Sequence, residues 1–334
     1  MLQPLLSPRR FARLPKDHPP QLLVVVDTEE EFAWGEGFSR EATTVRAMAG
    51  IPALQRLFEE YGVRPTYVID YPVATQPEAF GPLKEFHERG QAVIGAHLHP
   101  WVNPPYEEEL SNRNSYAANL GPRLEREKLA ALTEAIERSI GVRPTIYKAG
   151  RYGIGPATPS ILEALGYEID LSVAPRMDLR PDGGPDFMSF PPEPYWFGET
   201  RPLLEIPVSA DFVGWLAPFG PVLRRFADSR LGHALRVQAL LGRSRALNRL
   251  RISPEGMTTE QHQRLTRTLL RRGVRVFTMS FHSTSAAPGF TPYVRTDADL
   301  QRFHDRCRRY LDFFMGELNG KPTTPRNLYA NLSA

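Results

Sequence analysis

The sequence predicts an α/β protein whose sheet is largely parallel, and two observations carry this prediction. First, short apolar runs alternate with longer amphipathic stretches along most of the 334 residues, as in chains of strand–helix–strand units. Second, the run at 22–27 (LLVVVD) is apolar up to its last residue, which is typical of a parallel strand buried on both faces. Such a sheet is either open or closed into a barrel.

Seven strands and seven helices are expected in chain order. The strands are short runs rich in apolar residues, at 22–27, 65–70, 92–99, 144–149, 168–173, 203–208 and 274–281. The helices show apolar residues at helical spacing, at 45–61, 78–89, 123–140, 158–165, 222–250, 259–272 and 297–318. Glycine directly follows the first four helices, and Thr296 is a suitable N-cap for the last one.

These elements predict a single domain over 21–334, preceded by an N-terminal arm at 1–20. A helical insertion rich in arginine is expected at about 218–257. The segment 175–200 interrupts the alternation with many prolines, glycines and aromatic residues. It is too long for an ordinary connection, so we expect a loop that covers the site.

Composition narrows the class of protein. Hydrophobic residues make up 41% of the chain and charged residues 24%, which excludes wholesale disorder. No apolar run approaches the ~20 residues of a membrane-spanning helix. The single cysteine, Cys307, excludes an internal disulfide framework and a zinc site built mainly from cysteines. We expect a soluble protein of the cytoplasm.

Positive charge is concentrated in one segment. Residues 223–275 hold 13 arginines, no lysine and three acidic residues, a local charge of +10, whereas the whole chain carries +3. Such asymmetry fits contact with an anionic carrier or an anionic membrane surface. It fits equally a solvated helical face, and the sequence leaves both open.

Candidate site residues follow the predicted strands, where parallel α/β proteins place their chemistry. Asp27 and Glu29 follow the first strand, His97 and His99 end the third, and His282 ends the last. Two histidines spaced two apart on a strand leave the same face. Together with a carboxylate they form the ligand set of catalytic zinc sites. A pair of hydrogen-bonded core histidines and an acidic helix start are the alternatives.

Five segments, taken in order, resemble the motif regions of the polysaccharide deacetylases (NodB-homology, carbohydrate esterase family 4): VVVDTEEEF, VIGAHLHPW, YKAGRYGIG, IDLSVAP and MSFHSTS. The likeness extends over about 22–296. HLHPWVNPP, KAGRYG and the PYWFG region are most similar to the WalW-like branch of lipopolysaccharide biosynthesis. The resemblance implies a distorted (β/α)7 barrel and metal-dependent removal of an N-acetyl group from an amino sugar.

The resemblance also assigns roles by position. Asp27 corresponds to the catalytic base, Glu29 to a metal-binding carboxylate and His97 to the first metal histidine. Arg151 corresponds to the arginine that holds the base carboxylate, and His282 to the histidine that protonates the leaving amine.

The family's second metal histidine lies four residues after the first, where this chain has Trp101, so His99 is the candidate in its place. The expected metal is divalent, with Zn²⁺ the first choice. Substrate contacts are expected from Asp70, Trp101, Lys148, Tyr152 and Trp196. The expected partner is an acetylated amino sugar, on a lipid or nucleotide carrier, and no nucleic acid.

Two other functions remain open. One is a metal-dependent amidohydrolase acting on a small amide, whose H-x-H pair would normally end the first barrel strand. The other is a glycan-binding protein on a catalytically degenerate barrel, which would hold no metal.

Overall fold

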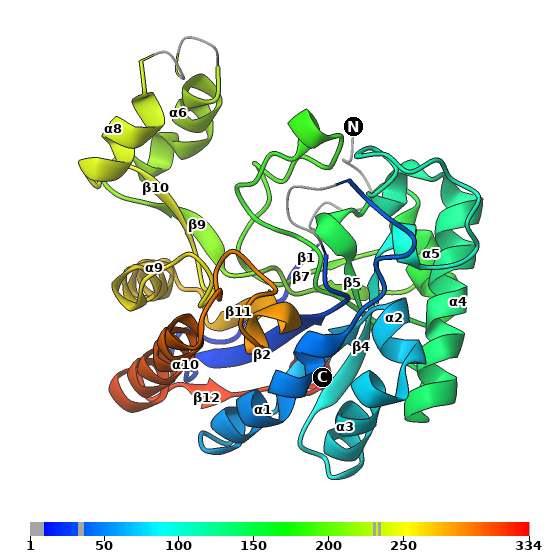
Figure 1. Cartoon of the computed structure of the whole chain (residues 1–334). Coiled ribbons are helices and arrows are strands. Elements are labelled where there is room, and N and C mark those ends of the chain that lie inside the picture. Colours follow the sequence, from blue (N-terminus) through cyan, green and yellow to red (C-terminus); the bar gives the residue numbers. More distant parts are fainter. Residues whose placement is uncertain (1–9, 33–36, 230–231, 233–234, 334) are drawn as a thin grey trace.

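The computed structural model describes residues 10–32, 37–229, 232 and 235–333. Seven parallel strands neighbour one another in the order β8–β6–β5–β4–β3–β2–β11 (Figure 1). Their bounds are β2 Gln21–Thr28, β3 Thr66–Ile69, β4 Val93–Leu98, β5 Ile146–Ala149, β6 Ile169–Asp170, β8 Leu203–Glu205 and β11 Val276–His282. The expected parallel sheet of seven strands is thereby confirmed.

The hydrogen-bonded ladder is open between β8 and β11, which makes the barrel a distorted one. Two single backbone hydrogen bonds bridge this gap through Ile252. Ile252 N donates to Ser209 O, and Ser280 N donates to Ile252 O. On the outer side of β8 the sheet continues antiparallel through β7 (Tyr195–Phe197) and β1 (Arg10–Phe11), and β12 (Lys321–Pro322) pairs with the start of β2.

Helices cover the outside of the sheet (Figure 1). They are α1 Ile51–Glu59, α2 Tyr71–Thr75, α3 Pro77–Glu88, α4 Pro122–Ile140, α5 Thr158–Leu165, α9 Thr259–Arg271 and α10 Asp297–Leu311. The last helix, α11 (Pro325–Ser333), instead packs Leu328 against the inner face of the sheet. Thr296 caps α10 as expected, and its hydroxyl accepts from the backbone N–H of Asp299. Among the described residues, no helix has the length and apolar character needed to cross a bilayer.

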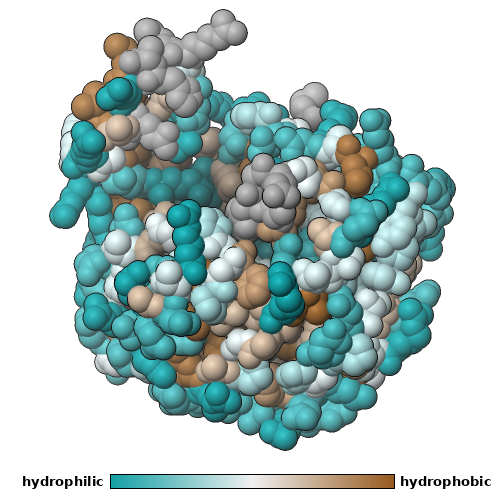
Figure 2. Space-filling view, in the orientation of Figure 1, coloured by the Kyte–Doolittle hydropathy of each residue, from teal (hydrophilic) through white to brown (hydrophobic). Residues whose placement is uncertain are grey.

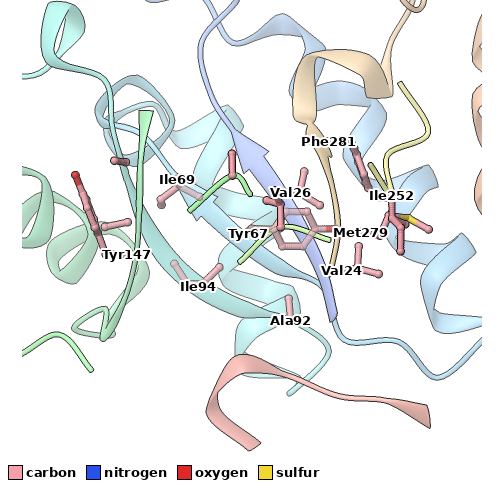
Figure 3. Close-up of a cluster of buried hydrophobic side chains, with 14 of the residues drawn as sticks. Val24, Val26, Tyr67, Ile69, Ala92, Ile94, Tyr147, Ile252, Met279 and Phe281 are labelled. Carbon is pink, nitrogen blue, oxygen red and sulfur yellow. The ribbon is translucent and has the colours of Figure 1, made fainter. Parts of the chain in front are cut away.

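The sheet has two apolar faces because its side chains alternate. Val24, Val26 and Tyr67 belong to the large cluster between sheet and helices, part of which is drawn in Figure 3. Leu23 and Val25 belong to a second, smaller cluster on the opposite, inner face. This inner face is the one that leads up to the polar residues at the strand ends.

The expected helix at 222–250 is wrong at its C-terminal end. Residues 210–213 and 248–251 form an antiparallel ribbon of β9 (Ala210–Val213) and β10 (Asn248–Arg251). The ribbon carries α6 (Gly220–Ala227) and α8 (Val237–Arg243), which project away from the barrel (Figure 1). Periodicity missed this ribbon because β10 (NRLR) reads as a continuation of the arginine-rich helix.

Candidate metal centre and active site

The inner face of the sheet ends in the candidate site. Leu23 and Val25 precede Asp27 at spacings of two, and Ile146 precedes Lys148 in the same way; all three apolar residues lie in the inner cluster. Because side chains alternate along a strand, Asp27 and Lys148 also point inward, above these three apolar residues. This inner face is closely packed at Gly95, where an added Cβ would lie 2.9 Å from both Ile146 O and Val68 Cγ1.

Strand register brings the predicted residues to one level. Asp27 of β2 is paired with His282 of β11, and His97 of β4 with Lys148 of β5. Residues 27 to 31, 97 to 101 and 282 to 285 are far apart in the chain, yet the parallel ladder places them at one end of the barrel. The predicted clustering of Asp27, His97 and His282 is thus realised around a single pocket, which all three line.

Glu29, His97 and His99 form a set that fits a divalent metal. Glu29 Oε2 lies 3.4 Å from His97 Nε2 and 3.5 Å from His99 Nε2, and the three ligand atoms lie within 4.8 Å of one another. The two distances are long for hydrogen bonds. They match the roughly 3.4 Å that separates ligand atoms around a tetrahedral ion with bonds of about 2.1 Å.

The two histidines offer the correct nitrogen to such an ion. His97 Nδ1 lies 3.0 Å from Lys148 O, and His99 Nδ1 lies 2.7 Å from Glu30 Oε2. Because a carbonyl and a carboxylate only accept, each Nδ1 carries the proton, and each Nε2 keeps its lone pair for the site. Burial also lowers the pKa of His99, which favours the neutral ring that a metal requires.

Glu30 is a buried clamp behind His99. Its carboxylate accepts from His99 Nδ1 and, at 2.8 Å, from the indole N–H of Trp101. Its backbone N–H donates to Asp70 Oδ2 at 2.8 Å. Burial raises the pKa of Glu30 to about 7 and that of Asp70 well above its ordinary value. The pair therefore supports the histidine from a site without access to solvent.

Asp27 is held by Lys148, and Arg151 does not hold it as the resemblance implied. Lys148 Nζ lies 2.5 and 2.7 Å from the two Asp27 carboxylate oxygens. Arg151 adopts a left-handed backbone (φ 54°) and donates to Ser115 Oγ at 2.6 Å. Burial would raise the pKa of Asp27, but Lys148, His97 and His282 lower it below its ordinary value. Asp27 is therefore ionised and able to accept a proton.

His282 is held from behind by Glu255. Glu255 is fully buried, and its carboxylate lies 2.8 Å from His282 Nδ1 while also accepting from the His282 backbone N–H and the Ser285 hydroxyl. Burial would lower the pKa of His282, but Glu255, Glu29 and Asp27 raise it well above its ordinary value. His282 is thereby kept in the form that can donate a proton.

The pocket above these residues has a volume of about 470 Å³, within the range of sites that bind small molecules. Its wall is largely aromatic and its rim carries two arginines; the residues beyond the reactive group include Phe32, Phe38, Trp101, Tyr116, Tyr152, Tyr293, Arg151 and Arg251. Trp101 stacks on His99 with ring centroids 4.3 Å apart. The predicted contacts at Trp101 and Tyr152 thus lie where a substrate could touch them.

Three other residues predicted to contact the substrate do not line the pocket. Lys148 uses its three N–H donors on Asp27 and Ser280, so none is left for a substrate. Asp70 is fully buried and caps α2 through Val73 N. Trp196 lies in β7, paired with β1, and packs on Tyr329 away from the pocket. The 175–200 segment thus contains a strand whose aromatic residues pack within the protein.

Glu30 and Glu255 were missed by the sequence-based reasoning. Glu30 stands in an acidic run in which spacing alone could not separate a ligand from its support. Glu255 is an isolated acid in an arginine-rich segment, 27 positions before its partner His282. Of the two, only Glu30 had a weak signal in the sequence: side chains alternate along a strand, so Glu30 is expected on the opposite side from the ligand Glu29.

Comparison with known proteins identifies the fold. No family model and no curated protein matches the sequence. A structure from Mycobacterium smegmatis described as a polysaccharide deacetylase is 15% identical, with 98% of this chain and 95% of that one covered and a TM-score of 0.54. One from Pseudomonas aeruginosa PAO1, described likewise, is 16% identical, with 96% and 93% covered and a TM-score of 0.51.

A third solved structure, PuuE allantoinase, is 16% identical, with 97% of this chain and 93% of that chain covered and a TM-score of 0.52. The three likenesses extend over nearly the whole chain, at sequence identities that speak for the fold alone. The chain therefore has the NodB-like deacetylase fold, a distorted barrel that is shared by proteins described as polysaccharide deacetylases and by an allantoinase.

Proposed function

We propose that the protein is a metal-dependent deacetylase that removes an N-acetyl or other N-acyl group from an amino sugar. One observation carries the proposal: Glu29, His97 and His99 form a metal-sized set in the same pocket as an ionised Asp27 and a protonated His282. Amide hydrolysis needs these three functions together, namely an electrophilic centre, a base and an acid.

A divalent ion at this set, with Zn²⁺ the first choice, would lower the pKa of water and polarise the acyl oxygen. Lys148 holds the Asp27 carboxylate in place, and Asp27 accepts the proton of the attacking water. Glu255 holds the His282 ring in place, and His282 donates a proton to the sugar nitrogen as the C–N bond breaks. The products are a carboxylate and a free amine.

The wall of the pocket supports a sugar as the substrate. Trp101 and Tyr152 offer aromatic surface beside the reactive residues, and such rings pack well on the apolar faces of sugars. The substrate is proposed to be a glycan or a glycan precursor on a lipid or nucleotide carrier, in lipopolysaccharide or other envelope polysaccharide synthesis. A cytoplasmic location is part of this proposal.

Hydrolysis of a small amide is the second candidate, favoured by the likeness to PuuE allantoinase. The same residues could perform it, because both reactions attack an amide carbonyl. The two candidates differ in the group that fills the aromatic pocket.

Release of free amine from N-acetylglucosamine oligomers by the zinc-loaded protein tests the proposal, with allantoin hydrolysis measured in parallel. Deacetylation that is lost in His97→Ala and kept in His18→Ala, a histidine outside the pocket, supports it. Hydrolysis of allantoin alone supports the second candidate. Sugar binding without metal and without turnover would show a degenerate glycan-binding protein.

A further inference from the structure

Most of the large apolar side chains that are exposed in the described part of the chain lie on one projection. Nine large apolar side chains are exposed among the described residues, and six of them lie in the segment 214–247, hereafter the tip: Trp215, Phe219, Val222, Phe226, Leu235 and Leu240. Trp215 is 76% exposed and Val222 72%. Figure 2 shows apolar side chains at the outer end of this projection, beside polar ones.

This exposure is confined to the outer side of a packed unit. Leu216, Leu223 and Leu241 pack inward against the cluster of Phe212, Ala217 and Leu247. On α6 and its N-cap, Phe219, Val222 and Phe226 are spaced by three and four residues, so they share the outer face of the helix. The tip therefore packs one apolar face on Phe212 of the ribbon and Met188 of the 175–200 segment, and it has a second apolar face that the described residues leave uncovered.

The same tip is strongly basic. Residues 214–247 contain six arginines, one aspartate and no lysine or glutamate. Arg224 is paired with Asp228, but Arg236, Arg243 and Arg245 form no ion pair within the described part of the chain. In contrast, three arginines after β10 are engaged outside the tip: Arg267 by Glu317, Arg272 by Asp211 of β9 and Arg275 by Lys16 O.

We propose that the tip docks on a lipid bilayer that carries anionic headgroups. Apolar residues including a tryptophan, flanked by arginines, match the composition of segments that lie in the membrane interface. Arginines add attraction to an anionic leaflet, which an uncharged partner would not explain. The antiparallel ribbon carries the tip outward from the barrel (Figure 1), so its outer face can enter the headgroup layer first, while Arg225 of α6 stays paired with Asp186 at 3.5 Å.

Contact between the tip and a bilayer would bring the pocket close to the membrane surface. Arg251, the last residue of β10, lines the pocket that holds Asp27 and His282. The ribbon spans only four residues per strand, about 13 Å at the usual rise. A tip held at the bilayer thus keeps the pocket close to headgroups. The docking itself does not depend on the proposed reaction.

Sedimentation of the full-length protein with vesicles tests the proposal. The vesicles are phosphatidylcholine alone or an equimolar mixture with phosphatidylglycerol, at low and at high salt. The wild type is expected to bind the anionic vesicles at low salt and to be released by high salt. The double variant Trp215→Ser/Phe219→Ser is expected to bind at least about tenfold more weakly, and Arg236→Gln/Arg243→Gln roughly tenfold more weakly.

The matched control is Phe11→Ser/Leu110→Ser, which removes two exposed apolar side chains from the barrel and is expected to bind like the wild type. Tryptophan fluorescence adds a second readout: a blue shift on vesicle addition that Trp215→Phe abolishes while the protein still sediments with the vesicles. Failure to bind anionic vesicles, binding that salt leaves unchanged, or equal loss in the control overturns the proposal. So does a wild-type dimer that Trp215→Ser/Phe219→Ser converts to monomer, since the tip would then cover a second copy.

Discussion

Lys148 Nζ lies 2.5 and 2.7 Å from the two carboxylate oxygens of Asp27, in a site where both side chains are almost completely buried. The ammonium thus fixes the position of the carboxylate and keeps it ionised. The arginine expected from the motif pattern is engaged elsewhere, with Ser115 and Asp182. The residue that holds the candidate base therefore lies in β5, where it is the direct cross-strand partner of His97.

Lys148→Met should destabilise the protein by about 3 kcal/mol or more, because it leaves the Asp27 charge buried without a partner. Urea unfolding measures the effect. Asp27→Asn/Lys148→Met should recover part of the loss, since the double variant contains neither charge. Lys16→Met, at an exposed position, is the control and should leave stability nearly unchanged. A loss that the double variant fails to reduce would contradict an ion pair as the cause.

Asp27→Asn should keep metal binding and lose at least about 100-fold in hydrolysis, as expected when a general base is removed. Metal content and amine release, measured on one preparation, give the two readouts. Turnover equal to that of the wild type would reject Asp27 as the base.

Glu30→Gln should weaken metal affinity by roughly 10- to 100-fold, the usual effect of losing a carboxylate that orients a metal-bound histidine. Trp101→Phe removes the other donor to Glu30 and leaves the bond to His99. It should therefore change metal affinity far less. Competition with a fluorescent chelator measures both variants, and equal losses would show that Glu30 acts only through general packing.

His262 should make the stability of the protein depend on pH. Its ring is buried against Ser253 O, and burial lowers its pKa from 6.5 to about 4. The unfolded chain takes up a proton as the pH falls through 6.5, whereas the folded protein does so only near 4. Stability is therefore fully present above pH 6.5 and is lost as the pH falls toward 4, by up to about 3 kcal/mol.

In His262→Gln the side chain at this position takes up no proton between pH 6.5 and 4. The stability advantage of the wild type over this variant should accordingly shrink between pH 6.5 and 4 in urea titrations. An advantage that stays constant over this range would refute the assignment to His262.

Much of the barrel was predictable because parallel strands are continuous apolar runs and their polar ends mark the site. Asp27, Glu29, His97, His99 and His282 were found in this way. Local pattern could not identify contacts set by strand register. The Lys148–Asp27 pair joins residues 121 positions apart, and only the ladder through β3 and β4 shows that they meet.

The ribbon at β9 and β10 was hidden for a different reason. Arginine and leucine alternate there in a way that fits either a helix or a strand, and the choice depends on packing against β9. Trp196 was misjudged similarly, since an aromatic triplet after many prolines fits an open loop as well as the short strand β7, which pairs with β1 and β8. Both errors concern short segments whose structure is decided by distant partners.

Anomalous diffraction at the zinc absorption edge, from crystals grown with Zn²⁺, tests the central claim most directly. One strong peak is expected within bonding distance of Glu29 Oε2, His97 Nε2 and His99 Nε2, and no such peak is expected in crystals of His97→Ala. A peak at other residues, or an empty site in the wild type at saturating Zn²⁺, would contradict the account.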